Sequence, residues 1–67
     1  MHRWRAMVFI RGNFLEEEFS SLTAAKQWSA QQLREVDDKC DLEWRQVGSW
    51  YDLGPRPDFS ARVVSIE

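Results

Sequence analysis

The first third of the chain alternates apolar and polar residues in two runs that meet at a turn signal. Residues 3–11 and 14–20 have the period of two that predicts β-strands. Gly12-Asn13 between them is typical of a two-residue hairpin loop. The residues that this hairpin would place on one core face are Trp4, Ala6, Val8, Ile10, Leu15 and Phe19.

A loop made of Gly12-Asn13 also fixes the expected register, with Ile10 opposite Leu15 and Val8 opposite Glu17. This register places the Glu17 carboxylate on the core face. An acidic side chain at such a position indicates either a β-bulge or a slipped pairing.

Residues 22–36 follow a helical period instead. Their apolar and small residues fall within an arc of about 140° at 100° per residue, which predicts an amphipathic helix. Ser20 or Ser21 can cap its first turn, and Asp37-Asp38 marks its expected end. The residues of the inner face are Leu22, Ala25, Trp28, Ser29, Leu33 and Val36.

The period of two returns in residues 42–47 and 50–53, which are separated by Gly48-Ser49. Glycine at the first central position suits a type II′ hairpin turn. The resulting register places Arg45 opposite Asp52, and such opposite charges stabilise a cross-strand pair. The residues expected to face the core are Leu42, Trp44, Tyr51 and Leu53.

Residues 54–58, which contain two prolines and a glycine, are expected to form an exposed loop before a last strand at residues 59–66. We therefore predict one α+β domain over residues 1–67 with the order ββαβββ. An antiparallel sheet of four or five strands would carry the helix on one face and leave the other face open.

Composition excludes several classes of function. With 67 residues, 8.0 kDa and 30% charged residues, the chain cannot spare the walls of a deep catalytic pocket. Its single cysteine, Cys40, and single histidine, His2, cannot complete a tetrahedral zinc site. We expect no enzymatic activity, no catalytic or metal-binding residues and no cofactor.

Charge and hydropathy give no sign of a membrane protein. The longest apolar run, residues 6–10, is far shorter than the roughly 20 residues of a membrane span. A lone cysteine allows no intrachain disulfide, so the expected compartment is reducing and cytoplasmic. The net charge of -2 is too balanced to indicate nucleic acid or membrane by itself.

The outward face of the predicted sheet mixes large apolar side chains with charges, which is typical of a protein-binding surface. Trp50 lies beside a turn on this face, whereas Trp4, Trp28 and Trp44 are expected in the core. The candidate partner-binding residues are Met7, Phe9, Phe14, Val47, Trp50, Arg5, Arg11 and Arg45. Another protein, a second copy of the chain, or tolerated exposure would each account for them.

Arg3, Arg5 and Arg11 alternate along the first run, a spacing that could follow the phosphates of a nucleic acid. The competing interpretation is that Glu16 and Glu18 neutralise them across the hairpin. The acidic residues are well placed for this, so nucleic-acid binding is the less favoured alternative.

Residues 3–36 resemble the arm-type DNA-binding domains at the amino termini of tyrosine recombinases. The residues that carry the resemblance are Trp4-Arg5-Ala6 in the first strand, then Phe19, Ser21, Ala25 and Trp28. The resemblance implies phosphate contacts by Arg3, Arg5 and Arg11. The chain departs from that family in having two strands before the helix and an acidic run at residues 16–18.

Together these patterns predict a non-enzymatic protein-interaction module that binds through its open sheet face. Its style is also similar to that of small accessory or inhibitor proteins of phages and other mobile elements. The alternatives are an arm-type DNA-binding module and a structural homodimer.

Overall fold

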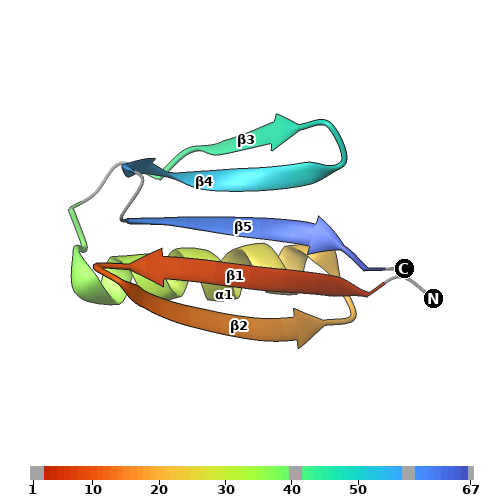
Figure 1. Ribbon diagram of the computed structural model, residues 1–67, viewed down its shortest axis with the longest axis horizontal. Helices are drawn as coiled ribbons and strands as arrows, with labels where there is room; N and C mark the ends of the chain where they lie inside the picture. Colours follow the sequence, from red (N-terminus) through yellow and green to blue (C-terminus); the bar gives the residue numbers. More distant parts are fainter. Residues whose placement is uncertain (1–2, 40–41, 57–58, 67) are drawn as a thin grey trace.

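The structure, a computed structural model, describes residues 3–39, 42–56 and 59–66. One helix packs across one face of a five-stranded antiparallel sheet, which confirms the predicted α+β class and the order ββαβββ (Figure 1). The elements are β1 (Trp4–Ile10), β2 (Asn13–Phe19), α1 (Leu22–Val36), β3 (Trp44–Val47), β4 (Trp50–Arg56) and β5 (Phe59–Ser65).

The last strand lies at the centre of the sheet. The strand order is β2-β1-β5-β4-β3, so β5 joins the two hairpins by pairing with β1 on one side and β4 on the other. Its inward residues Phe59, Ala61 and Val63 are buried. The two hairpins therefore share one core although they are distant in sequence.

The turn of the first hairpin lies one residue earlier than predicted. Arg11 and Gly12 occupy its centre with φ of 49° and 86°, the pattern of a type I′ turn, and Asn13 belongs to β2. This register pairs Val8 with Leu15 and also brings apolar residues together at both ends of the hairpin. We attribute the shift to these cross-strand contacts, which outweigh the left-handed backbone at Arg11.

Because each partner moves by two residues, no side chain changes face. Glu17 consequently stays on the helix side, opposite Ala6, and no bulge is needed to place it. Its side chain is nevertheless exposed, since β2 is an edge strand of which α1 covers little.

The helix begins and ends as the sequence predicts. Ser21 is the N-cap, and its hydroxyl accepts a hydrogen bond from the Ala24 amide at 3.0 Å. At the other end the Asp37 amide donates to the Leu33 carbonyl at 3.0 Å. Within the helix, the buried Ser29 hydroxyl donates to the Ala25 carbonyl at 2.8 Å, so this polar group is satisfied.

The second hairpin has the predicted register, with Val47 opposite Trp50 and Arg45 opposite Asp52. Gly48 has a φ of 61°, as the first position of a type II′ turn requires. The ion-pair partner of Asp52 is Arg62 and not the expected Arg45. The Asp52 carboxylate accepts a hydrogen bond from Arg62 Nε of β5 at 2.9 Å. Arg62 is on β5, and the sequence alone did not predict that this strand pairs with β4.

The predicted loop at residues 54–58 is wrong in its first part, because β4 continues to Arg56 through a register shift after Leu53. Gly54 makes this possible: its φ is 132°, and a Cβ there would lie 2.5 Å from Ser60 Cα. Beyond Leu53 the strand has no β3 partner, so Pro55 removes no hydrogen bond from the β3 ladder. Residues 57–58 lie outside the described residues.

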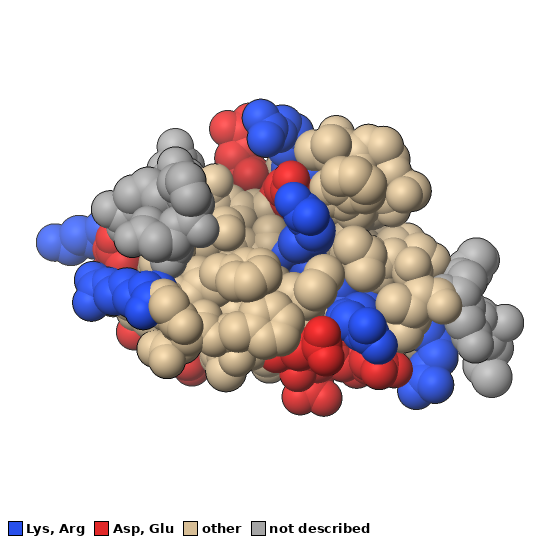
Figure 2. Space-filling view, viewed as in Figure 1, with Lys and Arg blue, Asp and Glu red and all other residues tan. Residues whose placement is uncertain are grey.

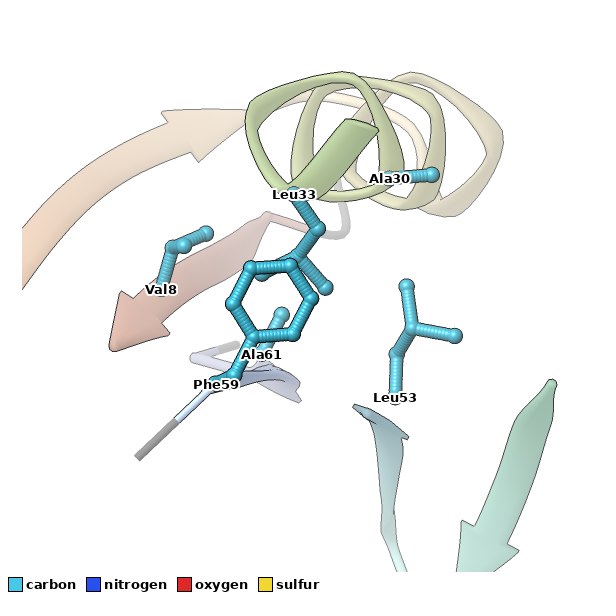
Figure 3. Packing of buried hydrophobic residues seen from close by; sticks show 6 residues of the cluster. All are labelled: Val8, Ala30, Leu33, Leu53, Phe59 and Ala61. Carbon is cyan, nitrogen blue, oxygen red and sulfur yellow. The ribbon is translucent and has the colours of Figure 1, made fainter. Parts of the chain in front are cut away.

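The main core cluster lies between α1 and the middle strands. Leu33 points from the helix toward Phe59 and Ala61, with Val8 on one side and Leu53 on the other (Figure 3). Ala6, Ala25 and Val63 form a second cluster. The residues packed against these clusters include the predicted core residues Trp4, Ile10, Phe19, Leu22, Trp28, Leu42, Trp44 and Tyr51.

Two residues of the predicted inner faces are not part of this core. Leu15 is 41% exposed and Val36 is 42% exposed, although both lie on the side that was expected. Leu15 is on the edge strand β2, and Val36 is the last residue of α1. Neither position has packed structure on all sides.

Candidate functional site

The sheet face opposite α1 is covered by none of the described elements, and it faces the viewer in Figures 1 and 2. The strand register arranges its side chains in rows that run across the sheet. The first row is Glu18, Arg5, Val64, Trp50 and Val47. The second row is Glu16, Met7, Arg62, Asp52 and Arg45. Phe14, Phe9 and Ser60 follow in the third row.

Phe9 and Phe14 form the most exposed apolar feature of this face. Their ring centroids lie 5.0 Å apart, and the two side chains are 41% and 51% exposed. Aromatic pairs of this geometry stabilise a hairpin by packing against each other. Both residues therefore keep exposed surface that is available for contact with another molecule.

Trp50 is also on the open face, as the sequence predicts, but it is half-buried. The guanidinium of Arg62 lies 5.2 Å from its ring centroid and shields one side of the indole. Among the described residues the indole Nε1 has no hydrogen-bond partner, and this atom is buried. Trp50 is therefore packed against its neighbours in the sheet and is less available for contact than a fully exposed tryptophan would be.

The candidate residues do not form one continuous apolar patch. Trp50 and Phe9 are separated by two strand spacings across the sheet and four residues along it, which amounts to about 17 Å. The ion-paired Arg62 and Asp52 lie in the row between them. Figure 2 shows charged side chains crossing the middle of the tan surface on this face.

Two of the arginines make the ion pairs that the sequence favoured. Arg3 lies 3.7 Å from Glu18, and Arg5 lies 3.5 Å from Glu18 and 3.9 Å from Glu16. Acidic side chains accordingly line the β2 edge beside basic ones in Figure 2. Positive potential along β1 is thereby reduced.

Arg11 and Arg45 differ from these arginines. Both are exposed, and within the described part of the chain neither makes an ion pair. Arg11 belongs to the turn and not to the strand, so it does not continue the predicted stripe of arginines. A left-handed backbone at a residue other than glycine is a strained feature, and here it lies beside the Phe9–Phe14 pair.

Sequence reasoning missed several surface residues. Arg62 and Val64 belong to the open face because β5 lies between the hairpins, and the periodicity of residues 59–66 does not reveal that strand order. The exposure of Leu15 and Val36 was not predicted from the sequence either. With Phe14 they line a groove of about 380 Å³ between the hairpin tip and the end of α1.

The described residues contain no group of three or more His, Cys, Asp or Glu side chains that could hold a metal ion. His2 and Cys40 lie outside the residues that the structure describes. In the described part of the chain, no helix is long and apolar enough to cross a bilayer.

Comparisons of the chain with protein-family models, with curated proteins and with solved structures find no match.

Proposed function

We propose that the protein is a non-enzymatic interaction module that binds another protein through its open sheet face. The observation that carries this proposal is the Phe9–Phe14 pair, which exposes two aromatic rings in tilted contact on a face without a covering element. Apolar groups at the centre with charges around them are characteristic of protein interfaces. Arg11, which has no ion-pair partner in the described structure, adds an orienting charge beside the rings.

The charges support a protein ligand over a nucleic acid. Arg3 and Arg5 lie within 4 Å of carboxylates that a phosphate would have to displace. In the second row of the open face, Arg62, Asp52 and Arg45 alternate in charge from strand to strand, which favours a ligand with both charges. A folded protein surface has that property, whereas a phosphate backbone does not.

The binding region that we propose includes all eight candidate residues, but their expected contributions differ. Phe9, Phe14 and Arg11 at the hairpin tip are the expected contact centre, because they are exposed. Met7, Val47 and Trp50 are half-buried and add supporting apolar surface. Arg5 and Arg45 lie toward the sides of the face.

A nuclease-treated pull-down from cells of the source organism tests this proposal, with wild type and Phe14→Ala compared by quantitative mass spectrometry. Thr23→Ala is the matched control, since Thr23 is exposed on the first turn of α1. We expect a protein that wild type and Thr23→Ala retain and Phe14→Ala loses.

Two further measurements identify the competing functions. A dimer by analytical ultracentrifugation that Phe14→Ala dissociates would indicate self-association through this face. Binding to duplex DNA at low salt, lost steeply at physiological salt and insensitive to Phe14→Ala, would favour the arginine-based alternative.

A further inference from the structure

The groove between the hairpin tip and the end of α1 lies mainly on the other side of the β2 edge from the open face. It has a volume of about 380 Å³, and its lining includes Ile10, Leu15 and Val36 beside Phe14, Asn13, Gln32 and Glu35. The exposed large apolar side chains of the described chain are Phe9, Phe14, Leu15 and Val36. All four gather at this end, since Phe9 packs against Phe14 and the other three share the groove.

One carboxylate lines this groove, and three more belong to residues that follow its lining residues closely in the chain. Glu35 lines it directly, Glu17 follows Leu15 by two residues on the same side of β2, and Asp37 and Asp38 follow Val36. In the described structure none of these four makes an ion pair. The carboxyl end of α1 points here as well and contributes a partial negative charge.

Few cations balance these acidic groups. Arg11 lies in the turn of the hairpin, and Lys39 follows Asp38 in the chain. The basic residue in the last turn of α1, Arg34, lines a second groove beside Trp44 and not this one, although Glu35 lines both. The lining of the groove at the hairpin tip is therefore mainly apolar, and the charged residues next to its lining residues in the chain are mostly acidic.

We propose that this groove docks a basic amphipathic segment of a partner protein. Apolar side chains of that segment would pack between Leu15 and Val36, and its Lys or Arg side chains would face these carboxylates. A second copy of the chain fits poorly, because placing two such grooves together would bring their acidic residues together. This inference rests on the proposed function for the kind of ligand, and it adds the charge of the partner and a second contact region.

Two designed 14-residue helical peptides test the charge of the ligand. They share one pattern of leucines, and one carries lysine where the other carries glutamate. In titrations of the ¹⁵N-labelled protein we expect the Leu–Lys peptide to shift the amide signals of Leu15, Glu35 and Val36, and the Leu–Glu peptide to leave them in place. Equal binding of both peptides, or no shift with either at millimolar concentration, would overturn the proposal.

Variants then test whether the groove itself is used. We expect Leu15→Ser to weaken binding of the Leu–Lys peptide roughly tenfold, as loss of a buried leucine contact does. Glu35→Gln should weaken it about two- to fivefold, the range for one exposed ion pair. Glu43→Gln is the matched control, because Glu43 precedes β3 at the opposite sheet edge. An equal effect of Glu43→Gln would show diffuse attraction to acidic surface and refute the groove.

Failure of this inference can be separated from failure of the proposed function. Phe9 is on the open face and does not line the groove. Phe9→Ala should weaken capture of an open-face partner and leave binding of the Leu–Lys peptide within twofold of wild type. Unchanged partner capture by Phe9→Ala would refute the open-face site, whereas loss of Leu–Lys peptide binding by Phe9→Ala would refute the groove as the peptide site.

Discussion

The guanidinium of Arg62 lies over the indole of Trp50, 5.2 Å from the ring centroid, while its Nε donates a hydrogen bond to Asp52. These three residues come from the adjacent strands β4 and β5, in neighbouring rows of the open face. The contact shields Trp50 and places a charged pair at the middle of the sheet. It also makes Trp50 part of the structure that holds the face together.

We therefore expect Trp50→Ala to lower the free energy of unfolding by about 2 kcal/mol, less than the 3–5 kcal/mol of a fully buried tryptophan. Phe14→Ala removes a side chain that is 51% exposed and should lower it by about 1 kcal/mol. Urea denaturation of both variants measures the difference. Equal losses would contradict the half-buried position of Trp50.

A second prediction concerns the strained turn of the first hairpin. Arg11 has a φ of 49°, which costs an ordinary residue about 1–2 kcal/mol, whereas asparagine tolerates it better. Arg11→Asn should therefore raise the free energy of unfolding by about 0.5–1 kcal/mol. Arg45→Asn provides the control, since Arg45 is an exposed arginine within a strand and asparagine is unfavourable there.

If Arg11 also contributes to binding, the same substitution should reduce affinity for the open-face partner while it stabilises the fold. A variant that is more stable and binds less well separates the two roles. Destabilisation by Arg11→Asn in thermal unfolding would show that the arginine side chain itself holds the turn.

Gly54 in the bulge of β4 and Gly48 in the turn before it give a matched comparison. A Cβ at Gly54 would meet Ser60 Cα at 2.5 Å and the Phe59 carbonyl oxygen at 2.6 Å, and both are backbone atoms. Gly48 has a positive φ but open space around it. We expect Gly48→Ala to cost about 1 kcal/mol and Gly54→Ala to cost at least about 3 kcal/mol, measured by chemical denaturation.

A similar loss in both glycine variants would mean that β4 adjusts its bulge without difficulty. In that case the close approach to Ser60 is not a requirement of the fold. Amide exchange at Leu53 and Ser60 would show whether the β4–β5 pairing survives in the Gly54→Ala variant.

The sequence was sufficient for the elements whose signals are local. The helix at residues 22–36 and the turn at Gly48-Ser49 were placed correctly, because capping and glycine preference act within a few residues. The turn predicted at Gly12-Asn13 lies at Arg11-Gly12, and we attribute this shift to side-chain contacts between the strands, which outweigh the turn preference of the Gly-Asn dipeptide. The continuation of β4 through Gly54 was also not predicted, because it depends on the close approach of Gly54 to Ser60 of β5.

The candidate site was predictable in part for the same reason. Alternation assigns Phe9, Phe14 and Trp50 to the open face, and the register confirms that assignment. Which of them lie together depends on strand order, and no local pattern encodes that β5 inserts between the hairpins. Arg62 and the separation of the face into two areas follow from that order.

The last prediction compares two residues of α1 that the helical period assigned to the same inner face. Leu33 is fully buried at 0% exposure in the main core cluster, whereas Val36 is 42% exposed at the end of the helix. Leu33→Ala should lower the free energy of unfolding by about 3 kcal/mol, through lost burial and the cavity that it leaves. Val36→Ala should cost less than about 1 kcal/mol, because half of the side chain is already in water. Val36→Ala should nevertheless weaken binding of the basic peptide severalfold, since Val36 lines the groove. A small loss of stability together with weaker peptide binding would show that the exposed Val36 side chain serves an interaction. A large loss of stability would show instead that Val36 is part of the packed core.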